Sequence, residues 1–224
     1  GMEDAIQLTF NSDTYKYNPI WSPDGKNLLW GDKMGNLSYI NIDTKKVVLV
    51  DESDSWEVRD YNWSPDSKWI AYTLPQTFGV NRILIYDTKS SESKPVTDTW
   101  YNSGQPAFDS NGKYLFFTSA RDFNPIYSNT EWNHAYRDMS KIYFVTLEKS
   151  TPSPFEPEND EVSVEKEAKP EKSETKDKKS DKDKGETETD ELTVKIDFDG
   201  IINRIIKLPV KAGNYWQITA IDNN

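Results

Sequence analysis

A short turn motif recurs along the chain at a spacing that few folds can use. Trp21-Ser22-Pro23-Asp24-Gly25-Lys26 returns 42 residues later as Trp63-Ser64-Pro65-Asp66-Ser67-Lys68, and after 45 more as the looser Phe108-Asp109-Ser110-Asn111-Gly112-Lys113. A turn signature that repeats every 40 residues or so, with short strand-like runs between its copies, indicates the four-stranded blades of a β-propeller. We assign a structural turn role to Trp21, Pro23, Asp24, Gly25, Trp63, Pro65, Asp66, Phe108, Asn111 and Gly112.

Each repeat contains runs that suit short strands. They lie at 18–21, 27–31, 37–42 and 46–50 in the first repeat, and at 61–63, 69–73, 83–86 and 94–97 in the second. The third repeat has 105–108, 114–118 and 142–147, and its displaced remainder is expected at 194–198 and 202–208. A run at 213–220 has the pattern of a first strand. The sequence therefore predicts an all-β chain, a partial β-propeller of about three four-stranded antiparallel blades plus the first strand of a fourth.

A charged stretch interrupts the third repeat. Residues 156–191 contain 15 acidic residues and 8 lysines, a net charge of −7 of the chain's −11, and they contain no aromatic residue. Such a segment buries too little apolar area to offset its ordering entropy, so we expect a disordered charged insert. The alternative is an acidic tail for a basic partner. The expected domains are 1–155 with blades 1 to 3, the third incomplete; 156–191, the insert; and 192–224, which completes blade 3 and starts blade 4.

The composition excludes several kinds of site. The chain has no cysteine and one histidine, which removes disulfides, thiolate metal sites and thiol nucleophiles. Its acidity argues against nucleic acid as a partner. No window approaches the roughly 18–20 apolar residues that span a bilayer, and the first residues lack the pattern of a signal peptide, so we expect no membrane insertion.

Candidate chemistry in the chain is sparse. There is no Gly-x-Ser-x-Gly motif, and Ser103 beside Gly104 is an ordinary loop serine. His134 is read as a general base or, more simply, as a structural hydrogen-bonding residue. The run 197–200 resembles the start of a calcium loop, but its twelfth position is Leu208 instead of Glu. We therefore predict no catalytic, cofactor-binding or metal-ligating residues and no cofactor in this chain.

The aromatic and loop residues offer two candidates for binding. Trp21 and Trp63 end equivalent strands and are expected to pack between blades, although a peptide or carbohydrate platform is an alternative. The excursion 121–139 is a long loop on a rigid scaffold, which often carries binding. A peptide-contacting rim is one interpretation of this loop, and packing against a neighbouring blade or domain is the other. The rim residues are Arg121, Asp122, Trp132, His134 and Arg137.

The turn motif resembles that of the β-propeller repeats, loosely of the WD40 kind, shared by tricorn proteases and the TolB translocation protein. The order of other segments is similar to bacterial tricorn-protease homologues over nearly the whole chain. These segments are 119–125, 130–134, 136–139, 141–143, 152–155, 196–201 and 208–215. That family consists of large serine peptidases in which propellers precede a PDZ domain and a catalytic domain. Nothing in this chain matches the catalytic part.

The resemblance implies a non-catalytic propeller fragment that serves as a scaffold and as a peptide gating or docking surface. The implied partners are peptide substrates and the other domains of the parent peptidase, with self-association through open propeller edges as a further expectation. The alternative is a stand-alone TolB-like module that binds a protein partner. Resemblance to exported homologues favours the periplasm or cell envelope, and a cytoplasmic location stays open.

Overall fold

The computed structural model describes residues 5–10, 13–122, 126–127, 134–135, 138–155 and 192–221. The expected disordered insert, 156–191, lies outside the described residues. The described residues up to 152 and those from 192 onward form one compact unit. Within the described ranges, no helix has the length and apolar character needed to cross a membrane.

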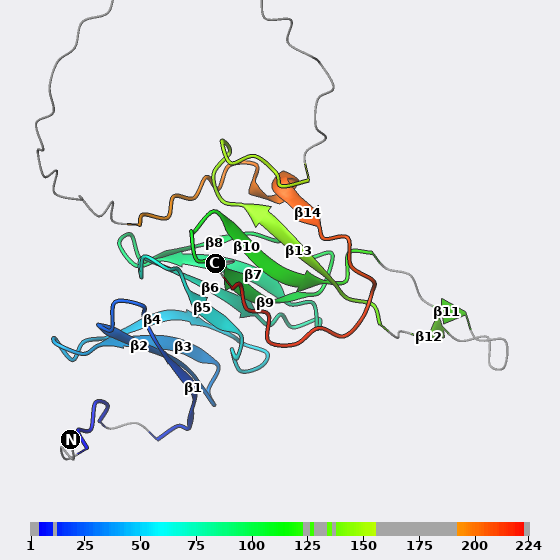
Figure 1. The fold of residues 1–224 in the computed structure, drawn as a ribbon. Helices are drawn as coiled ribbons and strands as arrows, with labels where there is room; N and C mark the ends of the chain where they lie inside the picture. Colours follow the sequence, from blue (N-terminus) through cyan, green and yellow to red (C-terminus); the bar gives the residue numbers. More distant parts are fainter. Residues whose placement is uncertain are drawn as a thin grey trace, which may run out of the picture. The chain divides into compact units, whose positions relative to one another are not determined.

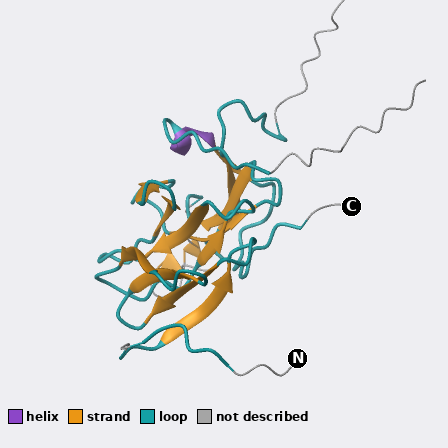
Figure 2. Ribbon diagram, turned by 90° about the vertical axis from the view of Figure 1, so that its left-hand side faces the viewer, coloured by secondary structure: helices purple, strands orange, loops and turns teal. Residues whose placement is uncertain are grey.

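The compact unit contains three antiparallel four-stranded sheets, which confirms the predicted fold class (Figures 1 and 2). Blade 1 consists of β1 (Lys16–Trp21), β2 (Asn27–Asp32), β3 (Asn36–Asn41) and β4 (Val47–Glu52). Blade 2 consists of β5 (Tyr61–Trp63), β6 (Trp69–Leu74), β7 (Arg82–Asp87) and β8 (Glu92–Pro95). Blade 3 consists of β9 (Ser103–Phe108), β10 (Tyr114–Ser119), β13 (Lys141–Thr146) and β14 (Ile205–Lys207). The 3₁₀ helix η1 (Ile201–Arg204) precedes β14, and a two-stranded ribbon pairs β11 (Ile126–Tyr127) with β12 (His134–Ala135).

The repeated motif forms the turn between the first two strands of each blade. In blade 1 the Ser22 hydroxyl donates to Asp24 Oδ1 at 2.5 Å and accepts the Asn27 N–H at 2.9 Å. Ser64 makes the same pair of bonds in blade 2. In blade 3 the carboxylate of Asp109 takes the place of the serine and accepts the Tyr114 N–H at 2.7 Å. The motif recurs because each turn needs a side-chain oxygen that accepts the backbone N–H of the residue that follows the turn.

Blades 1 and 2 pack through a core whose residues all come from neighbouring stretches of chain. Its member Trp63 is 5% exposed and meets Tyr39 of blade 1 edge-on with 5.8 Å between ring centroids. The buried members of this core are Leu29, Leu37, Val50, Val58, Trp63, Ile70, Tyr72, Leu84 and Tyr86. Trp63 thus packs between blades, as the repeat predicted.

The equivalent tryptophan of blade 1 lies in different surroundings. Trp21 is 55% exposed, so the prediction that it also packs between blades is wrong for the described residues. It shares a row with Leu28, Ile40 and Val47 on one face of the sheet, while Ile20 and its row contact the core shared with blade 2. The physical reason is that blade 1 covers the side chain of Trp63, whereas the described residues form no blade that covers Trp21.

Blades 2 and 3 pack through a core that includes residues from beyond the insert. Val194 and Ile201 are buried in it together with Ile83, Phe117 and Val145, and Ile196 and Phe198 pack at its margin. Residues 194–198, expected as a strand, have no place in a sheet; we call 192–201 the return segment. Its backbone bonds to turns and loops instead, because Asp66 Oδ2 accepts the Val194 N–H at 2.9 Å and Leu147 O accepts the Asp197 N–H at 2.9 Å.

The end of the chain approaches the first strand of blade 3. Residues 213–220, expected as the first strand of a fourth blade, contain one isolated bridge, from Gly213 to Ser140. The Gln105 side-chain amide donates to Tyr215 O at 2.8 Å. The segment does not count as a sheet strand, because an inner strand pairs with the second strand of its own blade and no described residue provides that strand.

Candidate functional site

One polar position recurs near the start of the inner strands, the first strand of each blade. Asn18, Asp60 and Gln105 each stand three residues before the aromatic residue of the turn motif. Asn18 and Gln105 have positive φ angles of 45° and 55°, a conformation that residues other than glycine seldom adopt. Gln217 in the C-terminal segment has a φ of 52°. The C-terminal segment therefore has the same kink as an inner strand, although it joins no sheet.

The kinks have a structural cause where blades 1 and 2 meet. The register of β1 against β2 shifts between Tyr17 and Ile20. The Tyr61 hydroxyl lies within donating distance of two carbonyl oxygens at this shift, 2.8 Å from Tyr17 O and 2.9 Å from Asn18 O. The same hydroxyl accepts the Gly31 N–H at 3.0 Å. Burial raises the pKa of Tyr61, so the phenol stays neutral and able to donate. A single side chain of blade 2 thus holds the bulge of blade 1 in place.

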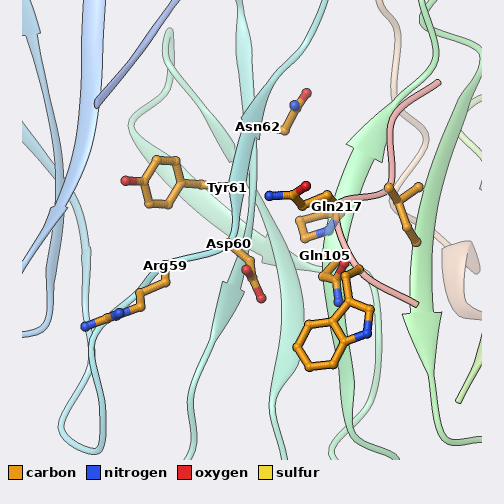
Figure 3. A pocket seen from close by; sticks show the side chains of 9 residues that line it. Arg59, Asp60, Tyr61, Asn62, Gln105 and Gln217 are labelled. Atoms are coloured by element: carbon orange, nitrogen blue, oxygen red, sulfur yellow. The ribbon is translucent and has the colours of Figure 1, made fainter. Parts of the chain in front are cut away.

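Asp60 of blade 2 and the kinked residues Gln105 of blade 3 and Gln217 of the C-terminal segment surround a common pocket, which we call the inner-strand hollow (Figure 3). Its volume is about 270 Å³. It is lined by Arg59, Asp60, Tyr61, Asn62, Gln105, Pro106, Trp216, Gln217 and Ile218. An adjoining pocket of about 230 Å³ shares Asp60, Gln105 and Trp216 with it and is otherwise lined mainly by polar side chains and glycine. In a propeller the first strands of the blades face the central channel, so the hollow lies on that side of the blades.

Asp60 is the only carboxylate that lines either pocket. Asp60 is exposed to solvent at the hollow, and partial desolvation by the neighbouring protein raises the pKa of its carboxyl above the ordinary value, an effect partly offset by the Gln105 backbone N–H. None of the described lysines or arginines forms an ion pair with it. The Arg59 guanidinium points away from it, 4.7 Å from the Tyr17 ring and 3.9 Å from Glu57 Oε1 (Figure 3).

Amide side chains complete the polar lining. The Gln105 Oε1 atom is buried and accepts no hydrogen bond from any described group. The Asn62 and Gln217 side chains also line the hollow, and Trp216 offers an indole that is 78% exposed. Carboxylate, amide and indole groups suit hydrogen bonding and stacking to a polar chain. Within the described ranges no cluster of three or more acidic or imidazole groups could hold a metal ion.

The predicted peptide-contacting rim is described only in part. Arg121 lies 3.6 Å from Asp98 and 5.6 Å from the Tyr101 ring centroid. Asp122 accepts from Lys141 Nζ at 2.8 Å and pairs with Lys207 Nζ at 2.9 Å, and these two cations lower the pKa of its carboxyl. Asp122 therefore holds β13 and β14 together, Arg121 contacts the stretch between β8 and β9, and their contact with a peptide stays a prediction.

The other three rim residues give less information. Trp132 and Arg137 lie outside the described residues, and His134 is described only by its backbone in β12. No sequence motif marks Asp60, Gln105 or Gln217 as functional. The available signal is positional, because Asn18, Asp60 and Gln105 stand three residues before the aromatic residue of each turn motif. This signal points to a site only once the inner strands are known to converge.

Comparison with known proteins places the chain in context. The family model described as the tricorn protease second beta propeller domain matches residues 2–224. Tricorn protease homolog 1 of Streptomyces coelicolor is 30% identical over 199 residues, which cover 89% of this chain and 17% of that protein. The tricorn protease homolog of Saccharolobus solfataricus is 26% identical over 223 residues, 99% of this chain and 18% of that protein.

The fold agrees with the sequence comparison. The crystal structure of the tricorn protease superimposes with a TM-score of 0.71 at 20% identity, covering 92% of this chain and 18% of that one. The chain thus spans about a fifth of the length of the relatives that it matches.

Proposed function

Because this chain belongs to the family of tricorn protease second β-propeller domains, we propose that it is a non-catalytic propeller segment of a tricorn-like serine peptidase, serving as a scaffold and as a gating or docking surface for peptides. The observation that carries the docking role is the inner-strand hollow. Its polar groups come from two blades and the C-terminal segment, and they face the side on which a propeller has its channel.

The chemistry of the hollow suits an unfolded peptide better than a small apolar ligand. Amide side chains match the donors and acceptors of a peptide backbone whatever its sequence, and an exposed indole stacks on many side chains. A site of this kind holds a peptide in passing without cleaving it. We therefore expect no peptidase activity from this chain, and casein turnover that a serine-directed inhibitor abolishes would contradict that expectation.

Peptide docking can be tested with one unique label, because the chain has no native cysteine. The variant Gln217→Cys carries an environment-sensitive dye at the hollow, and Asp43→Cys carries the same dye at an exposed turn of blade 1. We expect a short unstructured peptide to change the fluorescence in a saturable way at position 217 and to leave position 43 unaffected. No response at position 217, or an equal response at both positions, would overturn the docking role.

The open face of blade 1 supports the partner part of the proposal. Trp21, Val47 and Leu49 are about half exposed on it, whereas Trp63 at the equivalent position is covered by a preceding blade. A further blade from the parent peptidase is the occupant that fits this face. In the isolated chain a second copy is the available substitute, so light scattering should show a concentration-dependent dimer that Trp21→Ser weakens.

A further inference from the structure

The inner-strand hollow contains a carboxylate that has no cationic partner among the described residues. The Asp60 carboxylate meets one backbone N–H, from Gln105, and Gln105 Oε1 meets no donor among the described groups. The Gln105 Nε2 group is already committed to Tyr215 O at 2.8 Å. The one cationic side chain on the lining, Arg59, lies over Tyr17 instead. The Asp60 carboxylate is therefore the group of the hollow that a positively charged ligand would pair with.

The backbone fixes these acceptors in place. Gln105 and Gln217 both adopt positive φ angles, 55° and 52°, although neither is glycine. Residues held in this sparsely populated conformation concentrate where side chains must be aimed at a ligand. Gln105 and Gln217 line the hollow together with Asp60, and they come from two different segments (Figure 3).

An aromatic wall adds a second attraction for a cation. The Trp216 side chain lines both pockets and is 78% exposed. An indole face attracts ammonium and guanidinium groups through its quadrupole. Elsewhere in the chain the same pairing already occurs, with Lys16 Nζ 5.9 Å from the centre of Trp30.

We propose that the inner-strand hollow binds a primary ammonium group, in the first place the free amino terminus of a peptide, with Asp60 as the counter-ion and Trp216 as the aromatic wall. This inference rests on the proposed peptide docking and specifies which end of the peptide is held. An ammonium has three donors, so it pairs with the carboxylate and has donors left for the amide groups that line the hollow.

Isothermal titration calorimetry with three alanine-based peptide amides tests the proposal. The first has a free amino terminus, the second is N-acetylated, and the third is N-acetylated with one lysine. We expect acetylation to weaken binding by about tenfold or more, the effect of one charge-assisted hydrogen bond. If the N-acetylated lysine peptide binds as tightly as the free-amine peptide, the ammonium site stands and its ligand is a lysine side chain. Equal binding of the first two peptides would overturn the ammonium site while docking stands, and no binding of any peptide would overturn the docking itself.

Three variants locate the site. Asp60→Asn keeps the shape and removes the charge, so the free-amine peptide should bind about tenfold more weakly and the acetylated peptide as before. Gln217→Glu adds a second carboxylate at an exposed position of the lining and should tighten binding of the free-amine peptide alone. Asp43→Asn makes the same change of charge at an exposed turn and should change nothing. An unaltered preference for the free amine in both hollow variants would overturn the assignment to Asp60.

Discussion

The two inter-blade interfaces share one geometry but draw on the chain differently. The core between blades 1 and 2 is built from residues within a continuous stretch that ends at Tyr86. The core between blades 2 and 3 needs Val194 and Ile201, which follow β13 only after the long charged stretch. The core of the first interface therefore needs only residues of its own two blades, whereas the core of the second also needs the return segment.

The turns show the same difference. At the first interface one turn contacts the next directly, because the Ser67 hydroxyl accepts the Asp24 N–H at 3.0 Å. At the second interface the return segment stands between the turns: Asp66 Oδ2 accepts the Val194 N–H at 2.9 Å, and a Cβ on Gly112 would lie 2.3 Å from Val194 Cγ2. The turn of a repeat thus keeps its internal hydrogen bonds while its contact with the next blade changes, from the next turn at the first interface to the return segment at the second.

The largest expected effect concerns the first interface, at Gly31. A Cβ at this position would lie 2.1 Å from Val58 O, a backbone atom that no rotamer change can move. We expect Gly31→Ala to cost about 3 kcal/mol of unfolding free energy, the upper end of overpacking effects, as measured by urea denaturation. A loss below about 1 kcal/mol would mean that blades 1 and 2 can separate slightly without disrupting the core.

At the second interface, a second substitution should partly restore the stability that Gly112→Ala removes. Gly112→Ala meets a side chain instead of the backbone, in addition to the strain of a φ of +65°. The double variant Gly112→Ala with Val194→Ala should therefore lose less stability than the sum of the two single variants. Strict additivity would show that the return segment is not pressed against this turn.

A pair of valines isolates how the chain supplies each core. Val58 is 0% exposed in the first core and Val194 is 3% exposed in the second. Truncation of either to alanine removes similar apolar area, and we expect about 2 kcal/mol of lost stability in each case. Because the two variants should lose similar stability, any difference between their folding and unfolding rates reports when each valine becomes buried.

The kinetics should separate the two valines. Val194 contacts partners far away in sequence, such as Trp69, whose indole N–H donates to Val194 O across 125 positions. Contacts of such range tend to form late, so Val194→Ala should mainly speed unfolding and Val58→Ala should slow refolding more. Stopped-flow measurements of both rates check this, and equal slowing of refolding would show that the return segment docks early.

The sequence predicted the first two blades well because each carries its turn and its strands in one contiguous repeat. It failed at 194–198, where alternating apolar residues suggested a strand. Apolar alternation reports burial, and Val194 is indeed buried, but its backbone bonds to the turn of another blade. Nor could periodicity show that Trp21 is exposed, because burial there depends on a neighbouring blade and not on the residue's own repeat.

The candidate site was harder to predict for a related reason. Asp60, Gln105 and Gln217 are far apart in sequence and belong to no recognised motif, and only the convergence of the inner strands brings them to one hollow. The loop residues Arg121 and Asp122 attracted notice because they are charged and stand in a long excursion. In the structure their charges are paired within blade 3 and with its neighbouring loop.

A smaller effect should separate the two aspartates of the turn motif. Asp24 uses Oδ1 for both of its bonds, whereas Asp66 also uses Oδ2, which accepts the Val194 N–H, and its side chain is 1% exposed. Asp66→Asn places an amide donor against another donor and should cost about 1–2 kcal/mol. Asp24→Asn keeps its acceptor and should cost less than about 0.5 kcal/mol. Equal losses in thermal unfolding would indicate that the Val194 bond adds nothing to the turn.

The smallest effect is expected at the inner edge of the second interface, where the Gln105 N–H meets the Asp60 carboxylate and the first interface uses the neutral Tyr61 hydroxyl. Because folding raises the pKa of Asp60, the protonated form favours the folded state; this stability is complete below the unfolded pKa of about 3.9 and is lost as the pH rises through the folded pKa. At neutral pH the charge therefore lowers the stability slightly. Asp60→Asn should raise the unfolding free energy by less than about 0.5 kcal/mol after solvent screening, seen as a slightly higher melting temperature, and should lose this advantage in acid. The titratable neighbour that interacts with Asp60 is Tyr61, while the Arg59 guanidinium points away from it, so Arg59→Gln should leave the sign of the effect unchanged. A destabilised Asp60→Asn at neutral pH would mean that the Gln105 contact outweighs desolvation, and that the second interface, like the first, is held by a bond between its inner strands.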